Sequence, residues 1–369
     1  MKIAIDASRG FLDKKTGIEE YVYRLVKNLR KDLVDHEVVL YLRKGTLEKA
    51  QKAFEIPENW KFKEIPFKYF WTQIGMAWEF LTNSPDVLFI PAHTIPWIHP
   101  KNSVVTIHGL EYEHCPESYS LYSRWFHRFF IKKSCKWASK IVAISENTKK
   151  DLIALYGVDS RKIEVVYNGF TEISKGLKAG KKRKKNYLLF LGRVEQRKNV
   201  KRIVLAYDSL RASGKYEGQL ILAGKAGHGF GEINKSIRES QFSKDIILKG
   251  YVSDQERFSL IKNADIFLFP SLCEGFGLPI LEAQSVGVPV VTSKQGPMDE
   301  VAGDKNILVD PLKVDDMVKV MGNILDKPEL RKKVVERGLK NTKRFSWDKC
   351  GEETAEILLN FQKNQKETR

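Results

Sequence analysis

The sequence contains no long apolar run and no cleavable leader pattern. No stretch of the 369 residues approaches the roughly 18 consecutive apolar residues of a membrane-spanning helix. The start, MKIAIDASRG, has an acid at its sixth position, so we interpret it as a first strand and not as a signal peptide. These absences argue against an integral membrane protein. They favour a cytoplasmic protein that is either soluble or attached to the inner face of a membrane.

Cysteine is also scarce. The four cysteines, at 115, 135, 273 and 350, lie far apart and show no paired metal spacing. We therefore expect free thiols in a reducing compartment. His93, His108 and His114 match no compact ligand motif, so we expect no metal.

Acids are fewer than bases, which gives a net charge of +17. Such a charge suits nucleic acid, an anionic membrane surface or a phosphorylated substrate, and does not choose among them. Hydrophobic residues make up 42% of the chain, enough for two cores. A chain of this length predicts two domains of roughly 150 to 200 residues.

Short β-branched runs alternate with longer helical patterns, which is typical of parallel sheets covered by helices. The expected strands of the first half are 2–6, 37–42, 86–90, 103–107, 140–144 and 163–167. Those of the second half are 186–191, 219–223, 245–249, 264–269, 288–292 and 306–309. We predict an α/β protein with two doubly wound domains, 1–170 and 186–345, and a C-terminal helix, 346–369, that crosses back to the first. The lysine-rich stretch 171–185 fits a solvated linker better than a nuclear signal.

Ligands of such sheets bind beyond the carboxyl ends of the strands. Polar and glycine-rich loops follow the expected strands in both halves, so we expect a site in a central cleft between the domains. In GRVEQRKN (192–199), Gly192 allows a close backbone approach, and Arg193 and Lys198 can converge on an anion. Basic residues of a loop are more often only solvated, so this loop alone is weak evidence.

The stretch SLCEGFGLPILEA (271–283) places two acids on either side of a helix start. Pro279 favours a helix that begins between Gly277 and Pro279. The N–H groups at Phe276, Gly277 and Leu278 then suit a phosphate, and Gly275 and Gly277 leave room for it. Glu274 and Glu282 accept hydrogen bonds only, which suits sugar or ribose hydroxyls. A nucleotide sugar satisfies both acids and both cations, although helix dipoles alone also attract acids.

The chain resembles retaining glycosyltransferases of the GT-B fold, in the large family typified by mannosyltransferases of glycan and lipopolysaccharide assembly. The resemblance rests on five motifs in the family's order: TGIEEYVYRL, VVTIHG, GRVEQRKN, SLCEGFGLPILEAQSVGVPVV and KRFSW. It covers nearly the whole chain, from Met1 to about Leu359, and implies two Rossmann-like domains that face a central cleft.

The resemblance also implies roles for individual residues. Arg193 and Lys198 would hold the donor diphosphate without a metal, Glu274 would contact the transferred sugar, and Glu282 would contact the ribose. His108 would lie beside the sugar, with His93 left open. The remaining implied donor contacts are Gly17, Gly192, Gly250, Val252, Gly275, Phe276, Gly277 and Leu278. No cofactor beyond the nucleotide-sugar substrate is implied.

The implied activity is transfer of a hexose, with mannose from GDP-mannose as the first choice, to a glycan or lipid-linked glycan. The alternatives are a UDP-sugar-using transferase, a GT-B sugar epimerase, a catalytically silent homologue and a basic nucleic-acid-binding protein. The acid pair and the Arg/Lys loop disfavour the epimerase and the silent homologue. The spread of the basic charge disfavours nucleic acid as a partner.

One basic and aromatic region has two interpretations. Residues 119–140 (YSLYSRWFHRFFIKKSCKWASK) suit either a core helix or a helix on anionic lipid, and the stretch 67–81 shares this ambiguity. We favour the core helix and keep peripheral membrane contact as the alternative.

Overall fold

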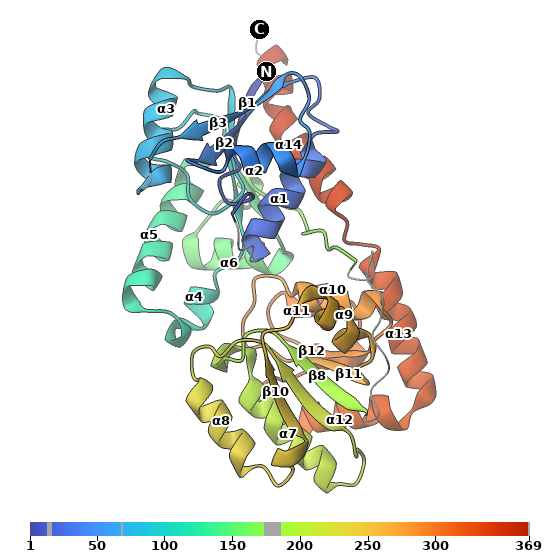
Figure 1. Cartoon of the computed structure of the whole chain (residues 1–369). Coiled ribbons are helices and arrows are strands. Elements are labelled where there is room, and N and C mark those ends of the chain that lie inside the picture. The colour runs from blue at the N-terminus through green and yellow to red at the C-terminus, as the bar shows by residue number, and fades with distance from the viewer. Residues whose placement is uncertain (13–16, 68, 173–185, 368–369) are drawn as a thin grey trace. The chain divides into compact units, whose positions relative to one another are not determined.

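The computed structural model describes residues 1–12, 17–67, 69–172 and 186–367. Within them the chain forms two compact units, each with one parallel sheet (Figure 1). The first unit comprises Met1–Leu110, Leu121–Gly169 and Phe345–Arg369, and the second comprises Glu111–Ser120 and Phe170–Arg344. Most of the predicted linker, residues 173–185, lies outside the described residues. Each unit is a doubly wound α/β domain, as the sequence predicts.

The first sheet has seven strands in the order β3-β2-β1-β4-β5-β6-β7. Their bounds are β1 Lys2–Asp6, β2 Glu37–Arg43, β3 Trp60–Ile65, β4 Val87–Ile90, β5 Ser103–Ile107, β6 Lys140–Ala143 and β7 Ile163–Val165. The sequence pattern predicts six of the seven and misses β3. Its sequence, WKFKEI, alternates apolar residues with charged ones because β3 is the edge strand beside β2.

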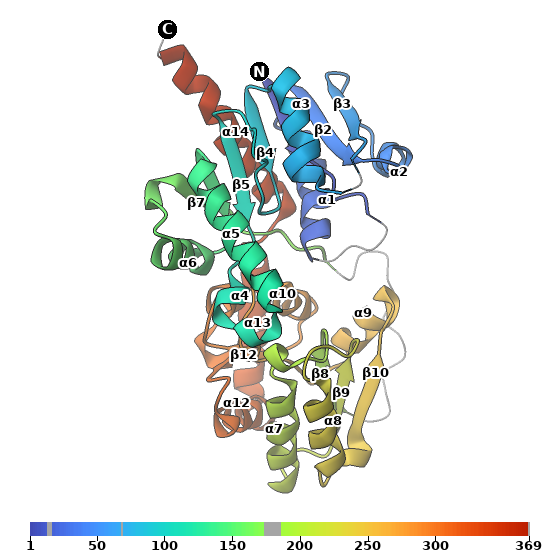
Figure 2. The same ribbon diagram turned by 90° about the vertical axis from the view of Figure 1, so that its left-hand side faces the viewer.

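Helices cover both faces of this sheet. Helices α1 and α14 pack against each other on one face, and α3 and α5 lie on the other (Figures 1 and 2). The helices of this unit are α1 Gly17–Leu29, α2 Leu47–Ala53, the π-helix η1 Trp71–Met76, α3 Ala77–Thr82, α5 Leu121–Trp137, α6 Glu146–Tyr156, the 3-10 helix η3 Ser160–Lys162 and α14 Trp347–Glu367. The buried side chains of β1, β2 and α1 form the core with Cys350, Ala355 and Leu358 of α14.

The second sheet has six strands in the order β10-β9-β8-β11-β12-β13. Their bounds are β8 Tyr187–Leu191, β9 Gln219–Ala223, β10 Ile246–Gly250, β11 Ile266–Phe269, β12 Val290–Ser293 and β13 Leu308–Val309, in agreement with the six expected.

Helices of the second unit form two groups. Helix α7 packs against α8 and α12, and α10 packs against α9, α11 and α13. Their bounds are α4 Glu111–His114, η2 Pro116–Ser118, η4 Gln196–Lys198, α7 Val200–Ala212, α8 Phe230–Glu239, η5 Ser243–Asp245, α9 Asp254–Lys262, α10 Leu278–Ser285, α11 Met298–Ala302, η6 Lys305–Ile307, α12 Val314–Asp326 and α13 Pro328–Thr342.

The expectation of four free thiols is wrong. Cys115 and Cys273 form a disulfide within the second unit, whereas Cys135 and Cys350 are free and buried. The two bonded residues are 158 positions apart in sequence. Because only the folded chain brings α4 to the loop after β11, no sequence spacing reveals the pair.

The favoured interpretation of α5 as a core helix is also wrong for much of its length. Only Ile131, Ser134 and Cys135 of this helix are buried. Tyr122 and Trp125 remain 73% and 58% exposed. The described residues contain no helix long and apolar enough to cross a membrane, so α5 exposes its aromatic residues without being a candidate span.

Candidate functional site

The two motifs singled out in the second half meet where the sheet changes its direction of winding. Strands β8 and β11 are central neighbours, with Leu188 opposite Ile266. From β8 the chain continues to β9 on one side, and from β11 it continues to β12 on the other. The chain therefore leaves β8 and β11 toward opposite sides of the sheet, and this is the position at which ligands of doubly wound sheets bind.

Lys198 and Glu274 are the predicted site residues that the structure brings into contact. Lys198 ends the short helix η4, and its Nζ donates to Oε1 of Glu274 in the loop after β11. Both side chains are only 11% exposed. Burial acts to raise the pKa of Glu274, but Lys198 and Arg197 outweigh it and hold that pKa below its usual range. Glu274 is therefore a carboxylate at neutral pH.

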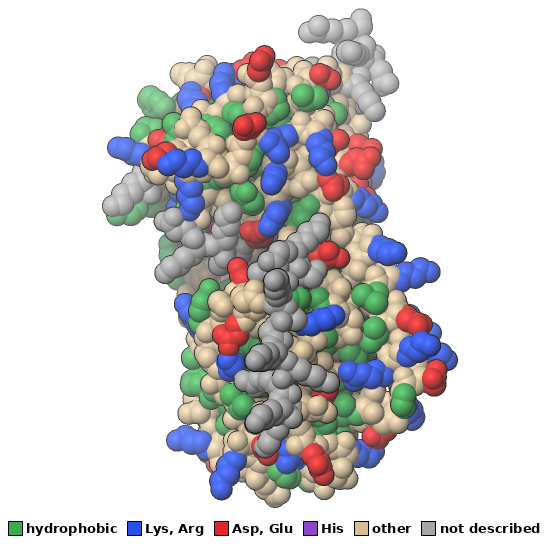
Figure 3. All heavy atoms as spheres, turned by 45° about the vertical axis from the view of Figure 1, so that its right-hand side comes forward, with side chains coloured by type: hydrophobic (Ala, Val, Ile, Leu, Met, Phe, Trp, Pro, Cys, Tyr) green, Lys and Arg blue, Asp and Glu red, His purple; other side chains and the backbone are tan. Residues whose placement is uncertain are grey.

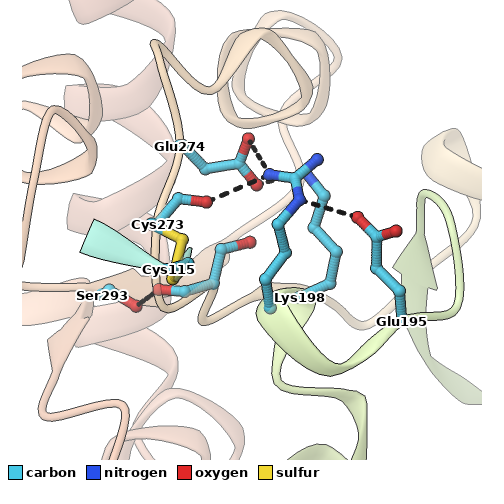
Figure 4. The surroundings of a disulfide bond; sticks show 8 residues. Cys115, Glu195, Lys198, Cys273, Glu274 and Ser293 are labelled. Carbon is cyan, nitrogen blue, oxygen red and sulfur yellow. Dashed lines mark hydrogen bonds and ion pairs between the residues drawn. A yellow bond between two sulfur atoms is a disulfide. The ribbon is translucent and has the colours of Figure 1, made fainter. Parts of the chain in front are cut away.

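Arg197 belongs to the same network, although no sequence motif indicates a role for it. Its Nε lies 2.8 Å from Oε1 of Glu195, and its Nη1 lies 3.6 Å from Oε2 of Glu274. Nη1 also donates to the carbonyl of Cys273 at 3.2 Å (Figure 4). The signal that could have found it is its place next to Lys198 in the same loop.

Arg193 occupies a different position in the loop. It is exposed, and its aliphatic stem lies on Gly227, where an added Cβ would come within 2.7 Å of it. Gly192 adopts a φ of 155°, which residues with a side chain rarely adopt, and a Cβ at Gly224 would lie 1.8 Å from the Gly192 carbonyl. The backbones after β8 and β9 can approach this closely only because glycine stands there. The cation of Arg193 is thus on the surface of the loop.

Helix α10 begins at Leu278, within the predicted range. Gly277 precedes it at φ 107°, a left-handed conformation that favours glycine. Pro279 stands in the first turn, and no side chain caps the helix. Phe276 is buried, and so is the glycine at 275. The anion site at this helix start stays a prediction.

Glu282 projects from α10 and is held by a second cation that no sequence motif indicates. Its Oε2 pairs with Nη2 of Arg257 on α9. Burial raises the pKa of Glu282, and the attraction to Arg257 only partly offsets this effect. The structure therefore places the two acids in separate ion pairs.

The implied donor contacts Gly250 and Val252 lie at the end of the edge strand β10 and just after it. Gly250 adopts φ 68°, and its carbonyl accepts a 2.7 Å hydrogen bond from the N–H of Gly224. Tyr251 is exposed and lies beneath Nζ of Lys225, 5.2 Å from the ring centre. Val252 is half-buried next to it. An exposed aromatic ring beside the loop after β9 is suited to stacking on a base.

In the first unit, His108 follows β5 and is buried. Its Nε2 donates to the carbonyl of Pro91 at 2.7 Å, which leaves Nδ1 as the acceptor of the neutral ring. The ring meets Tyr21 edge-on, with centres 4.6 Å apart. Burial lowers the pKa of His108 to about 4, so the ring is neutral at pH 7.

His93 lies beside His108, with ring centres 5.1 Å apart. It adopts φ 63°, a left-handed conformation that is uncommon for residues other than glycine. Burial lowers its pKa well below the usual value, and His108 and Arg9 add to this effect. Arg9 pairs with the buried Glu19 at 3.0 Å. Gly17, at the start of α1, faces open space where a Cβ would stand.

Two Rossmann-like units with these sheet orders define a GT-B glycosyltransferase fold. Two family models match the chain: Glycosyltransferase Family 4 over residues 15–171 and Glycosyl transferases group 1 over residues 175–341. The chain belongs to the glycosyltransferases that these two models describe.

Individual relatives carry sugar-transfer names. The chain is 29% identical over 263 residues to O-antigen chain mannosyltransferase B of Escherichia coli, a match that covers 69% of each protein. It is 26% identical over 219 residues to O-antigen chain mannosyltransferase RfbU of Salmonella typhimurium, over 59% of each. The chain is thus similar to mannosyltransferases along the matched part.

Solved structures share the fold at lower identity. Anabaena Alr3699/HepE in complex with UDP and glucose has a TM-score of 0.70 at 18% identity, covering 98% of this chain and 100% of that one. WaaG, a glycosyltransferase involved in lipopolysaccharide biosynthesis, has a TM-score of 0.68 at 18% identity, with 97% and 99% covered. These likenesses support the fold class.

Proposed function

We propose that the protein transfers a hexose, mannose from GDP-mannose first, from a nucleotide sugar to a glycan or lipid-linked glycan. The observation that most directly supports this proposal is the contact of Lys198 with Glu274 after the central strands β8 and β11. This places a cation for a phosphate and an acceptor for sugar hydroxyls side by side. No metal enters the proposal, since Lys198 and Arg193 supply positive charge for the leaving diphosphate.

In the proposed reaction the donor replaces one ion pair with two better-matched contacts. A diphosphate competes for Lys198, and Glu274 then becomes available to the hydroxyls of the sugar. The bond from the anomeric carbon to the phosphate oxygen breaks, and the acceptor oxygen bonds on the same face. Because both events occur on one face, the configuration is retained, and the leaving diphosphate takes the proton of that hydroxyl. His108, neutral at pH 7, offers Nδ1 to the sugar as a hydrogen-bond acceptor.

The names of the relatives support mannose and a polysaccharide acceptor, because two of them are O-antigen chain mannosyltransferases. The Anabaena structure supports the alternative UDP donor, since that protein was solved in complex with UDP and glucose. For nucleic acid as a partner we find less support. On the face drawn in Figure 3, Lys and Arg side chains are scattered among Asp and Glu and form no stripe.

A thermal-shift screen with GDP-, UDP- and ADP-sugars, followed by donor hydrolysis assays with and without EDTA, tests this proposal. We expect GDP-mannose to raise the melting temperature of the wild type more than that of Arg193→Ala, and hydrolysis to persist in EDTA. If no nucleotide sugar stabilises the wild type more than the variant, the donor site is assigned wrongly. Loss of hydrolysis in EDTA would instead refute only the metal-free part.

We also propose that α5 attaches the protein to an anionic membrane. The helix contains Arg and Lys but neither Asp nor Glu, and its exposed apolar residues are Leu121, Tyr122, Trp125 and Phe126. A pocket on the helix is lined by Trp125, Arg128, Phe129, Lys132, Lys133 and Lys136. Aromatic residues next to cations suit the interface of an anionic bilayer, where apolar burial and charge attraction add.

Flotation with vesicles of anionic or neutral phospholipid at several salt concentrations tests the membrane proposal. We expect the wild type to float with anionic vesicles at low salt and to be released as salt rises. The double variant Tyr122→Ser/Trp125→Ser should float less, whereas Leu312→Ser, which removes an exposed apolar residue of the second unit, should float like the wild type. Failure of the wild type to float at low salt would refute the proposal.

A further inference from the structure

The disulfide lies inside the network that positions Glu274. Cys273 immediately precedes Glu274 in the loop after β11, and its partner Cys115 follows the short helix α4 (Figure 4). Both cysteines are buried. Their segments, Glu111–Ser120 and the loop after β11, belong to the same compact unit. The bond therefore fastens a second segment directly to the backbone next to Glu274.

Arg197 joins this covalent link to the loop after β8. Its guanidinium donates to the carbonyl of Cys273 at 3.2 Å and approaches Glu274 at 3.6 Å. Its own carbonyl accepts a 2.8 Å hydrogen bond from the N–H of Leu272. The two loops are thus clamped by one arginine on either side of Cys273. Movement of Cys273 would shift both the clamp and the carboxylate that follows it.

The segment held by Cys115 adds further polar groups around this network. Burial raises the pKa of Glu111, Glu274 adds to the rise, and Arg197 and Lys198 oppose it. Burial, and to a smaller extent the negative charge of Glu111, raises the pKa of Tyr119 to about 12. Glu111 and Tyr119 therefore interact electrostatically with the network that contains Glu274 and Arg197. Their place there depends on a segment that the disulfide fastens.

We propose that the Cys115–Cys273 disulfide is a thiol-sensitive positioning element of the donor site. When the disulfide is formed, it holds the loop of Glu274 in the arrangement that sugar transfer requires. When the disulfide is reduced, the loop and the segment 111–120 can separate, and sugar transfer slows. The inference rests on the proposed function. Closing the bond removes a proton and an electron from each thiol, and a disulfide oxidant such as oxidised glutathione accepts both pairs and becomes two thiols. A dithiol reverses the exchange.

A purely structural disulfide would make a different prediction. It would lower the melting temperature when opened but leave turnover unchanged well below that temperature, because a cross-link acts mainly on the unfolded chain. A positioning element instead changes kcat in the folded protein. The kcat and KM for the donor, measured at a temperature where every variant is folded, therefore separate the two roles.

The experiment compares the full-length wild type, Cys115→Ser and the matched control Cys135→Ser, which loses a buried free thiol. Each protein is incubated with oxidised glutathione or dithiothreitol, alkylated after denaturation and weighed by mass spectrometry. Donor hydrolysis gives kcat and KM, and hydrogen exchange reports on the amides of residues 272–277. Circular dichroism melts verify folding.

We expect the oxidised wild type to carry two alkylated thiols and the reduced protein four. Reduction should lower kcat about tenfold and speed exchange at 272–277. Cys115→Ser should show the low kcat and fast exchange under both conditions, and Cys135→Ser should follow the wild type. If dithiothreitol does not reduce the buried disulfide, the kcat and the hydrogen exchange of Cys115→Ser still test the proposal.

Four alkylated thiols in the glutathione-treated wild type would overturn the proposal, and so would wild-type kcat and exchange in folded Cys115→Ser. If no nucleotide sugar is hydrolysed by any protein, the proposed function fails. Exchange at residues 272–277 then decides the positioning role alone: faster exchange in Cys115→Ser supports it, and unchanged exchange refutes it.

Discussion

The loops after the central strands of the two sheets differ in charge: one unit holds charged side chains there, and the other holds neutral rings. After β8 and β11, the second unit buries the pair Lys198–Glu274 and adds Arg197. After β4 and β5, the first unit holds the neutral rings of the half-buried His93 and the buried His108, with Tyr21 edge-on to His108. The ends of these central strands thus present charges in one unit and uncharged rings in the other, where the nearby charges belong to the Arg9–Glu19 pair.

The difference follows from what each burial costs. A buried charge is tolerated when a partner and hydrogen bonds compensate it, as Lys198 and Glu274 do for each other. An imidazole avoids that cost by losing its proton, which is what the lowered pKa of His108 expresses. On the proposed function, charges would hold the diphosphate, and neutral groups would orient the sugar without attracting the phosphate.

The largest effect is expected from removing the charge of the second unit. On the proposed function Lys198 is a preorganised cation for the developing diphosphate, so Lys198→Ala should lower kcat about 100- to 1000-fold. Lys201→Ala, on the exposed surface of α7, should leave kcat within about twofold, because surface substitutions rarely matter. Steady-state donor hydrolysis measures both. A Lys198→Ala enzyme with near-normal kcat would show that the ion pair is only structural.

The two acids of the second unit should separate in their effects. Glu274→Ala should mainly lower kcat, because on the proposed function its carboxylate contacts the transferred sugar. Glu282→Gln should mainly weaken nucleotide binding, by about 10- to 100-fold for a lost charged hydrogen bond. Isothermal titration with GDP and steady-state kinetics measure the two effects. Equal losses of kcat and affinity in both variants would contradict distinct roles, provided that melting curves show both proteins folded.

The sequence predicted the strands and the loops after them because parallel strands are buried on both faces and appear as continuous apolar runs. It predicted Lys198 and Glu274 from the loops that follow two of those strands. It could not predict the Cys115–Cys273 bond or the Arg257–Glu282 pair, because both depend on contacts between segments that only the fold brings together. The edge strand β3 was not predicted, because its alternating charged residues resemble those of a surface segment.

The smallest expected effect concerns the neutral histidine rings of the first unit. His108 has a folded-state pKa of about 4, below the unfolded value of 6.5, so the unfolded chain binds the proton more readily. Stability is therefore lost as pH falls through 6.5 toward 4. At pH 5.5 this single group should cost about 1.4 kcal/mol relative to pH 7.5. His93 acts in the same direction, since its pKa is also lowered.

Urea unfolding at pH 7.5 and pH 5.5 measures this loss in the wild type and in His108→Gln, which keeps a side-chain N–H for the carbonyl of Pro91. We expect the wild type to lose more stability than the variant on acidification, by about that same 1.4 kcal/mol. His36→Gln is the matched control: burial also lowers the pKa of His36, but this side chain is only partly buried, so its substitution should reduce the acid loss by less than that of His108. Equal acid losses in the wild type and His108→Gln would mean that His108 is protonated at pH 5.5. The first unit would then present charge to its ligand, as the second does.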